Sequence, residues 1–343
     1  MNLKKVRVER KRRQPARKRY LSTMARRHRI LRLAGLAFGL AGVIAGVVTL
    51  WAWRQYRRDP LPQIDSGLAA LQLTGLNEYP LRTASGEARI VRELAFEGAR
   101  AGSLLLTLSL PAGAPEPLPV MVVLGGLEVG RDSLKYVEVH GRNALVTLQY
   151  PRSPAYWYES LPIAKLPEIR EAVVAIPSRV ASILAWIRVQ PWADPARINL
   201  LGYSFGAIFV PCSARLAQIH GIPIRSLVLA YAGTDLPVLL AANARFRPAF
   251  LRKPAAWLAG ALLRPVEPAL HLPHLRSPAL FVNGLGDEMI PLPQARRMHA
   301  LHGGPQTVLE LDAKHMDPKR PELTREIVRR SWDWLVASGA ANG

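Results

Sequence analysis

The hydrophobic pattern divides the chain into one long apolar stretch near the N-terminus and a region where short apolar runs alternate with helical repeats. Residues 33–53 form 21 consecutive uncharged positions. As a helix rising about 1.5 Å per residue, this stretch spans roughly 30 Å, the thickness of the hydrocarbon core of a bilayer. Trp51, Trp53 and Tyr56 lie where an aromatic belt meets a membrane interface. The pattern predicts one transmembrane helix over residues 33–53.

The remainder of the chain alternates between strand-like and helix-like patterns. Eight short apolar runs are predicted as strands, at residues 92–97, 103–110, 120–124, 144–149, 198–203, 226–231, 279–283 and 308–311. Helical patterns cover residues 132–140, 166–189, 205–220, 293–302 and 322–337. Such alternation is typical of βαβ units. We therefore expect an α/β fold with a mostly parallel, eight-stranded sheet and helices on both faces.

Two segments do not follow this alternation. Residues 54–88 are rich in Pro, Gly and polar residues without a clear period, and we interpret them as a linker and the edge of the domain. Residues 234–276 contain six prolines and an amphipathic helical pattern. We interpret this segment as a lid inserted over the C-terminal edge of the sheet; a pair of surface helices without a role in binding is the alternative. The domain itself is expected over residues 89–338, with a short tail at 339–343.

The charge of the chain is concentrated around the apolar stretch. The formal net charge is +21, and residues 1–32 hold fourteen Lys and Arg against one acid, Glu9. Arg54, Arg57 and Arg58 follow the stretch, so the large domain is only mildly basic. By the positive-inside rule, residues 1–32 form a basic cytoplasmic tail and the domain lies outside the cytoplasm, in the periplasm if the source is bacterial.

Composition excludes several classes of protein and leaves others open. A hydrophobic fraction of 49% with 7% aromatic residues is ordinary for a globular protein and excludes disorder of the whole chain, a collagen-like repeat and a polytopic transporter. A cleaved signal peptide is disfavoured because the apolar stretch exceeds about 15 residues and no A-x-A-like site follows it. Arg26-Arg27 fits a twin-arginine signal but lies within a longer run of cations. Phosphate binding by residues 1–32 is possible, but the adjacent membrane span explains the charge, and we expect no nucleic-acid partner.

The clearest chemical motif is Gly202-Tyr203-Ser204-Phe205-Gly206, which ends a predicted strand and opens a predicted helix. In a G-x-S-x-G turn the serine occupies a strained position, and bulky residues at the glycine positions would clash with neighbouring backbone. At the start of a helix, Ser204 also lies near backbone N–H groups that stabilise a developing oxyanion. We therefore predict Ser204 as a nucleophile.

A serine nucleophile requires a base, and His315 is the best candidate. It follows the last predicted strand and precedes the last predicted helix, whereas the other histidines lie in the tail, in helices or in the insertion. The orienting acid should end an intervening strand. Asp287, just past residues 279–283, is favoured over Asp235, and the adjacent Glu288 stays open. The order Ser204, Asp287, His315 is one of the known triad orders.

An oxyanion hole requires two backbone donors. The apolar run 120–124 leads into Gly125-Gly126-Leu127, a glycine turn that leaves backbone N–H groups accessible. We predict the N–H groups of Leu127 and Phe205 as the donors. A simple turn at Gly125 and Gly126 is the alternative.

These motifs together resemble those of the α/β-hydrolase fold superfamily. The nucleophile turn GYSFG, the acid turn NGLGDEMIP, the histidine loop DAKHMD and the glycine turn LGGL all occur in that superfamily's order, over roughly residues 90–338. The resemblance implies a Ser204 nucleophile, a His315 base and an Asp287 acid that work through an acyl-enzyme. One departure is Gly125, which stands where many members have His before the oxyanion glycine.

We therefore expect a membrane-anchored serine hydrolase that acts on a small-molecule carboxylic ester or thioester. An acyltransferase with the same triad, a peptidase and a non-catalytic membrane-tethered binding protein are the alternatives. Cys212 is the only cysteine, which excludes an intramolecular disulfide, and we expect it to be buried and inert. No P-loop, dinucleotide fingerprint or HExxH motif occurs, so no cofactor and no metal are expected.

Overall fold

The computed structural model describes residues 3–83, 85–98, 102–113, 117–126, 130–138, 141–151, 165–243, 249–317 and 319–343, with side chains from residue 29 onward. The chain divides into two compact units, Met1–Arg57 and Arg58–Gly343.

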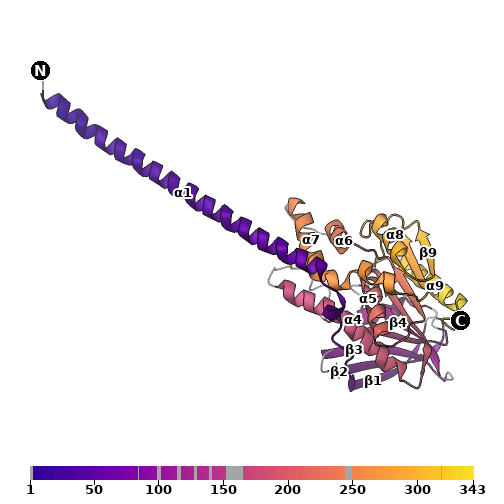
Figure 1. Cartoon of the computed structure of the whole chain (residues 1–343). Helices are drawn as coiled ribbons and strands as arrows, with labels where there is room; N and C mark the ends of the chain where they lie inside the picture. Colours follow the sequence, from indigo (N-terminus) through magenta and orange to yellow (C-terminus); the bar gives the residue numbers. More distant parts are fainter. Residues whose placement is uncertain are drawn as a thin grey trace. The chain divides into compact units, whose positions relative to one another are not determined.

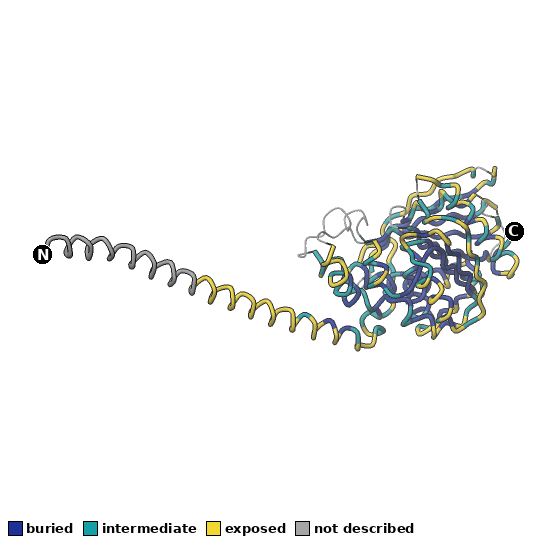
Figure 2. Tube along the Cα trace, turned by 90° about the horizontal axis from the view of Figure 1, so that it is seen from above, coloured by how far each residue is buried: buried dark blue, intermediate teal, exposed yellow. Residues whose placement is uncertain are grey.

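The first unit consists of helix α1 (Leu3–Arg57), the indigo helix of Figure 1. By length and composition, its segment Arg29–Arg57 is apolar enough to cross a membrane. A signal sequence near the N-terminus would meet the same two criteria. Large apolar side chains along this segment, among them Leu36 and Phe38, are exposed. The segment is mostly coloured as exposed in Figure 2. The predicted span at residues 33–53 lies within this helix.

The second unit is built on a mixed sheet with nine strands in the described residues. Its strands are β1 (Gln72–Arg82), β2 (Ala88–Gly98), β3 (Gly102–Pro111), β4 (Leu118–Leu124), β5 (Ala144–Leu148), β6 (Ala193–Tyr203), β7 (Ser226–Ala230), β8 (Ala279–Gly284) and β9 (Gln306–Leu311). Their order is β1-β2-β3-β5-β4-β6-β7-β8-β9. The pairs from β1 to β5 are antiparallel, and those from β5 through β4 to β9 are parallel.

Helices cover both faces of this sheet. They are α2 (Leu61–Ile64), α4 (Leu166–Arg188), α5 (Phe209–Ile219), α6 (Leu236–Asn243), α7 (Arg252–Leu263), α8 (Leu292–Leu301) and α9 (Pro321–Ala337), with 3-10 helices η1 (Gly130–Tyr136), η3 (Ser204–Ile208), η4 (Ala249–Leu251), η5 (Arg264–Val266), η6 (Pro268–Leu270) and η7 (Leu272–His274). The prediction of an α/β fold with a mostly parallel sheet is confirmed.

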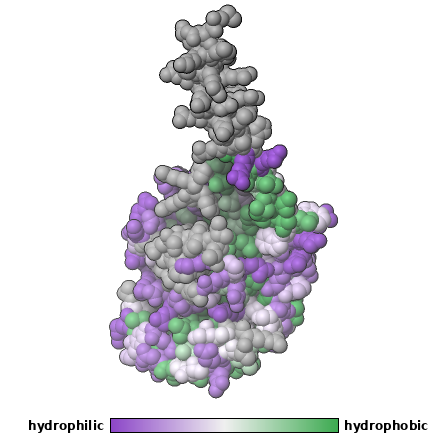
Figure 3. All heavy atoms as spheres, turned by 90° about the vertical axis from the view of Figure 1, so that its left-hand side faces the viewer, coloured by the Kyte–Doolittle hydropathy of each residue, from purple (hydrophilic) through white to green (hydrophobic). Residues whose placement is uncertain are grey.

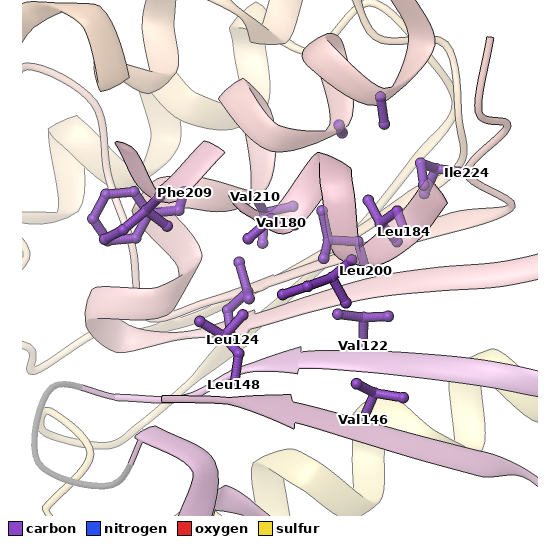
Figure 4. Packing of buried hydrophobic residues seen from close by; sticks show 14 of the residues in the cluster. Val122, Leu124, Val146, Leu148, Val180, Leu184, Leu200, Phe209, Val210 and Ile224 are labelled. Carbon is purple, nitrogen blue, oxygen red and sulfur yellow. The ribbon is translucent and has the colours of Figure 1, made fainter. Parts of the chain in front are cut away.

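The core forms two layers because side chains alternate across each central strand. On β4, Val122 and Leu124 belong to the layer under α4 and α5, whereas Met121 and Val123 belong to the layer under η1 and α9. Figure 4 shows the first layer, in which side chains of the two helices pack onto β4, β5 and β6. In Figure 2 the buried residues, in dark blue, concentrate in the interior of this unit. On the face shown in Figure 3, hydrophilic residues cover much of the described surface of this unit.

The strand count differs from the sequence prediction by one. The ninth strand, β1, lies in the segment that was expected to be linker and domain edge. It is an edge strand whose side chains are almost all exposed, and it contains Gly75, Pro80 and a shift of register between Leu73 and Gly75. An exposed strand interrupted in this way has no hydrophobic alternation, and only its pairing with β2 defines it. The helix predicted at residues 132–140 is the shorter 3-10 helix η1, and residues 139–140 lie outside the described part of the chain.

The described parts of the insertion at residues 234–276 consist mostly of the short helices α6, η4, α7, η5, η6 and η7. Its two ends are joined by Glu267, whose carboxylate accepts the backbone N–H groups of Asp235 and Leu236 at 2.9 and 2.7 Å. Burial raises the pKa of Glu267. The end of α6 reaches the loop after β8, since Asn243 Nδ2 donates to the carbonyl of Met289 at 2.7 Å. The insertion thus contacts the loop that carries Asp287.

Candidate functional site

Ser204 lies at the sharp turn between β6 and η3. Its backbone φ is 52°, a conformation that non-glycine residues rarely adopt. Both glycines of the motif are required by close packing: a Cβ at position 202 would lie 2.5 Å from the Ala207 Cα, and one at position 206 would overlap the carbonyls of Leu124 and Gly125. Ser204, which is half-buried, thus lies at the carboxyl end of the parallel strands.

Ser204, His315 and Asp287 form one hydrogen-bonded chain. Ser204 Oγ lies 2.8 Å from His315 Nε2, and His315 Nδ1 lies 2.7 Å from Asp287 Oδ2. The Asp287 side chain is 2% exposed and that of His315 12%. The three residues follow β6, β8 and β9, so the parallel sheet brings their loops to one edge.

The other candidate acids lie away from His315. Asp235 has a left-handed φ of 69°, and its Oδ2 is 3.8 Å from a guanidinium nitrogen of Arg297. Glu288 is exposed. Among the three candidates, only Asp287 is within hydrogen-bond distance of the imidazole in the described structure.

The glycine turn after β4 lies beside the nucleophile turn. Gly125 is buried, and its carbonyl accepts a hydrogen bond of 2.7 Å from the hydroxyl of Tyr150. A Cβ at position 125 would overlap Ser133 Oγ, so no larger residue fits there. Leu127, one predicted oxyanion donor, lies outside the described residues. The other, Phe205, packs edge-on against Tyr150 with ring centroids 5.5 Å apart.

Tyr231 lies against the imidazole of His315. The two rings meet edge to face with centroids 5.7 Å apart. Tyr231 is fully buried and has a φ of 57°. Burial and the negative charges of Asp287 and Glu326 raise its pKa to about 12, so the phenol stays protonated. Its hydroxyl has no hydrogen-bond partner within the described chain.

The sequence motifs did not point to a role for Tyr150 or Tyr231. Both stand at the end of apolar runs that were interpreted only as strands, at residues 144–149 and 226–231. A tyrosine at the carboxyl end of a parallel strand is the signal that would have pointed to them, because loops at that edge form the site.

Several other histidines of the described domain have partners away from this site. His220 Nε2 lies 3.0 Å from Asp65, and His271 and His302 contact the backbone carbonyls of Pro265 and Ser277. Cys212 is buried, which raises the pKa of its thiol to about 12. Within the described residues, no group of three or more His, Cys, Asp or Glu is arranged to hold a metal ion.

Comparison with solved structures reveals the same fold in several esterases. Acetyl xylan esterase 1 from Thermoanaerobacterium superposes with a TM-score of 0.57 at 15% identity, covering 82% of this chain and 93% of the esterase. An acetyl xylan esterase from Paenibacillus gives 0.57 at 15% identity, with coverages of 79% and 92%. A cold-adapted esterase from an Arctic intertidal metagenomic library gives 0.50 at 14% identity, with coverages of 76% and 98%.

No family model matches the sequence, and no curated protein matches it. At these identities the structural likeness concerns the fold. The chain has the α/β-hydrolase fold, in agreement with the order of motifs in its sequence.

Proposed function

We propose that the protein is a membrane-anchored serine hydrolase that cleaves a carboxylic ester or thioester through an acyl-enzyme on Ser204. The observation that carries the proposal is the continuous hydrogen-bonded chain from Ser204 through His315 to Asp287, with Ser204 at a φ of 52°. A serine hydroxyl is a weak nucleophile by itself, and a buried, oriented imidazole is what activates it.

The reaction begins when Ser204 Oγ attacks the acyl carbon and its proton passes to His315 Nε2. Asp287 accepts the Nδ1–H hydrogen bond and stabilises the imidazolium. The backbone N–H groups of Phe205 and Leu127 are the proposed donors to the oxyanion. His315 then returns the proton to the leaving alcohol or thiol, and the C–O or C–S bond breaks. Water activated by His315 attacks the acyl-enzyme and releases the acid and free Ser204.

Esters and thioesters are the substrates that require the fewest catalytic groups beyond Ser204, His315 and Asp287. The leaving group is an alkoxide or thiolate that one imidazolium can protonate. The structural neighbours named as acetyl xylan esterases point to the same class. Asn243 of the insertion contacts the acid loop at Met289, which supports the interpretation of residues 234–276 as a lid beside the site.

Membrane anchoring rests on the segment Arg29–Arg57 and on the charge around it. This helix is long and apolar enough to span a bilayer, and fourteen basic residues precede residue 33. We propose that the basic tail stays in the cytoplasm and that the hydrolase unit lies on the other side of the membrane.

The test is labelling of the full chain in detergent micelles with a fluorophosphonate, which reacts with activated serines. The natural protein and Ser338→Ala should be labelled and should hydrolyse acyl esters. Ser204→Ala should be unlabelled, with kcat/KM at least about 10³-fold lower. Ser338 is a matched control because its Oγ donates to the Leu335 carbonyl at the end of α9. A natural protein that is unlabelled and inert on short and long acyl esters would refute the proposal.

A further inference from the structure

We infer that Tyr150 is a positioning residue that holds the glycine turn after β4 against the nucleophile turn and thereby sets the geometry of the oxyanion site. The inference deepens the proposed function and rests on it. It concerns a residue that touches neither Ser204 Oγ nor His315 and acts through the backbone of Gly125 and the side chain of Phe205.

The hydroxyl of Tyr150 makes the first contact. It donates a hydrogen bond of 2.7 Å to the carbonyl oxygen of Gly125 and so joins the segments that follow the neighbouring strands β5 and β4. Tyr150 is 2% exposed, so water does not compete for this bond. Burial raises the pKa of the phenol well above its ordinary value, which keeps the hydroxyl a protonated donor at every pH at which the enzyme works.

The ring of Tyr150 makes the second contact. It meets the Phe205 ring edge-on at 5.5 Å and an interplanar angle of 85°, and the Phe209 ring lies 6.2 Å away. Phe205 is the residue after the nucleophile, so one side chain contacts the nucleophile turn and the glycine turn together. No shift of one turn relative to the other leaves both contacts intact.

Backbone packing shows why the spacing of the two turns matters. Gly206 lies so close to Leu124 and Gly125 that a Cβ there would be 2.6 Å from the Gly125 oxygen. The oxygen held by Tyr150 is therefore the same atom that faces the nucleophile turn. Gly126, the next residue, accepts the backbone N–H of Gly130 at 3.2 Å. Tyr150 thus holds Gly125, and the adjacent Gly126 is hydrogen-bonded to the first residue of η1.

This restraint matters for rate because oxyanion donors act by preorganisation. Each donor must lie about 2.7–3.1 Å from the position of the oxyanion, and a displacement of about 1 Å lowers the rate about 10²-fold. When the glycine turn is released from Tyr150, substrate still binds, but the proposed donors from the two turns no longer both meet the transition state at the required distance. The effect should therefore appear in kcat and not in KM.

The experiment compares Tyr150→Phe, which keeps the ring and removes the hydroxyl, with Ser178→Ala. Ser178 is a buried hydroxyl on α4 that donates to the Ile64 carbonyl and accepts the Ser66 N–H, so it controls for the loss of a buried hydrogen bond outside the site. Full-length proteins in detergent are assayed on an oxygen ester and on its thionoester, in which sulfur replaces the carbonyl oxygen. Rates are divided by the number of sites that a fluorophosphonate labels at completion, so misfolded protein does not count.

Tyr150→Phe should lower kcat on the oxygen ester about 10- to 100-fold, with KM within about twofold. The loss on the thionoester should be smaller, since sulfur is a poor acceptor for the oxyanion donors. A kcat within twofold of the natural value, or equal losses on both substrates, would overturn the inference. If Ser204→Ala retains activity, the proposed function itself fails; if Ser204→Ala is inert and Tyr150→Phe is unaffected, only the role of Tyr150 fails.

Discussion

The carboxylate of Asp287 binds the imidazole of His315 with one oxygen and the backbone of its own loop with the other. Oδ2 lies 2.7 Å from His315 Nδ1, while Oδ1 accepts the backbone N–H groups of Met289 and Ile290 at 2.8 and 3.0 Å. The acid is therefore fixed by the backbone before it meets the base. This arrangement selects the tautomer in which His315 Nε2 faces Ser204 as an acceptor.

Asp287→Asn should lower kcat about 10³- to 10⁴-fold, because the amide stabilises the wrong tautomer and carries no charge for the imidazolium. Asp235→Asn is the matched control, since Asp235 faces Arg297 instead of His315. Steady-state kinetics of both variants measure the effect. A larger loss for Asp235→Asn than for Asp287→Asn would show that the acid has been misassigned.

Gly206→Ala should abolish activity and destabilise the fold. The new methyl group would overlap the carbonyls of Leu124 and Gly125, and rigid strand and turn backbone cannot yield. We expect a decrease of about 2 kcal/mol or more in the free energy of unfolding, measured by urea denaturation. Gly286→Ala is the comparison for stability, because a Cβ there would meet nothing closer than 3.4 Å. Equal stability of the two variants would contradict the packing argument.

Tyr231→Phe should leave the free energy of unfolding unchanged or slightly raise it. The Tyr231 hydroxyl is buried without a partner in the described chain, so its removal relieves a desolvation penalty of about 1–3 kcal/mol. The ring that packs against His315 is retained. Tyr231→Ala, which removes the ring, should lower both stability and kcat. A marked destabilisation of Tyr231→Phe would reveal a partner for the hydroxyl.

The free energy of unfolding should fall as the pH drops below about 6.5. Burial lowers the pKa of His271 to about 4, while its unfolded value is near 6.5. Between these values the unfolded chain binds the extra proton, so acid favours unfolding. The buried His299 and His302, whose pKa values are also lowered by desolvation, act in the same direction.

Urea titrations at pH 7.5 and pH 5 measure this effect. The contribution of His271 alone is about 2 kcal/mol over that interval. His271→Gln, which retains a donor toward the Pro265 carbonyl, should reduce the acid-induced loss by about that amount. An unchanged loss in this variant would mean that His271 is not the group that titrates.

The full chain should remain in the membrane fraction after an alkaline carbonate wash and be released by detergent. An alkaline phosphatase fused after Gly343 should be active, since this reporter folds only outside the cytoplasm, and the membrane-bound protein should retain its N-terminal residues. These expectations follow from the apolar segment Arg29–Arg57 and the basic tail before it. Removal of the segment during export, or an inactive fusion, would contradict the proposed anchor or its orientation.

The local hydrophobic pattern of the sequence was sufficient to predict most strands of the sheet. The eight runs that were predicted from hydrophobic periodicity correspond to β2 through β9. The pattern is strongest for β4, β5, β7 and β8, which are buried along their whole length and are therefore almost entirely apolar. The order of Ser204, Asp287 and His315 could also be predicted from the sequence, since each residue lies in a turn that follows an apolar run.

Which residues lie in contact with one another depends on the tertiary structure and could not be predicted from the local sequence pattern. The strand β1 is defined by its hydrogen bonds to β2 and not by its own exposed side chains. The distances of 2.7 and 2.8 Å that link Asp287, His315 and Ser204 depend on strand order and parallel registration. The contacts of Tyr150 with Gly125 and of Tyr231 with His315 join residues far apart in the chain. The periodicity of the sequence indicates which face of a helix or strand is buried. Which residues that face contacts depends on the packing of the whole sheet.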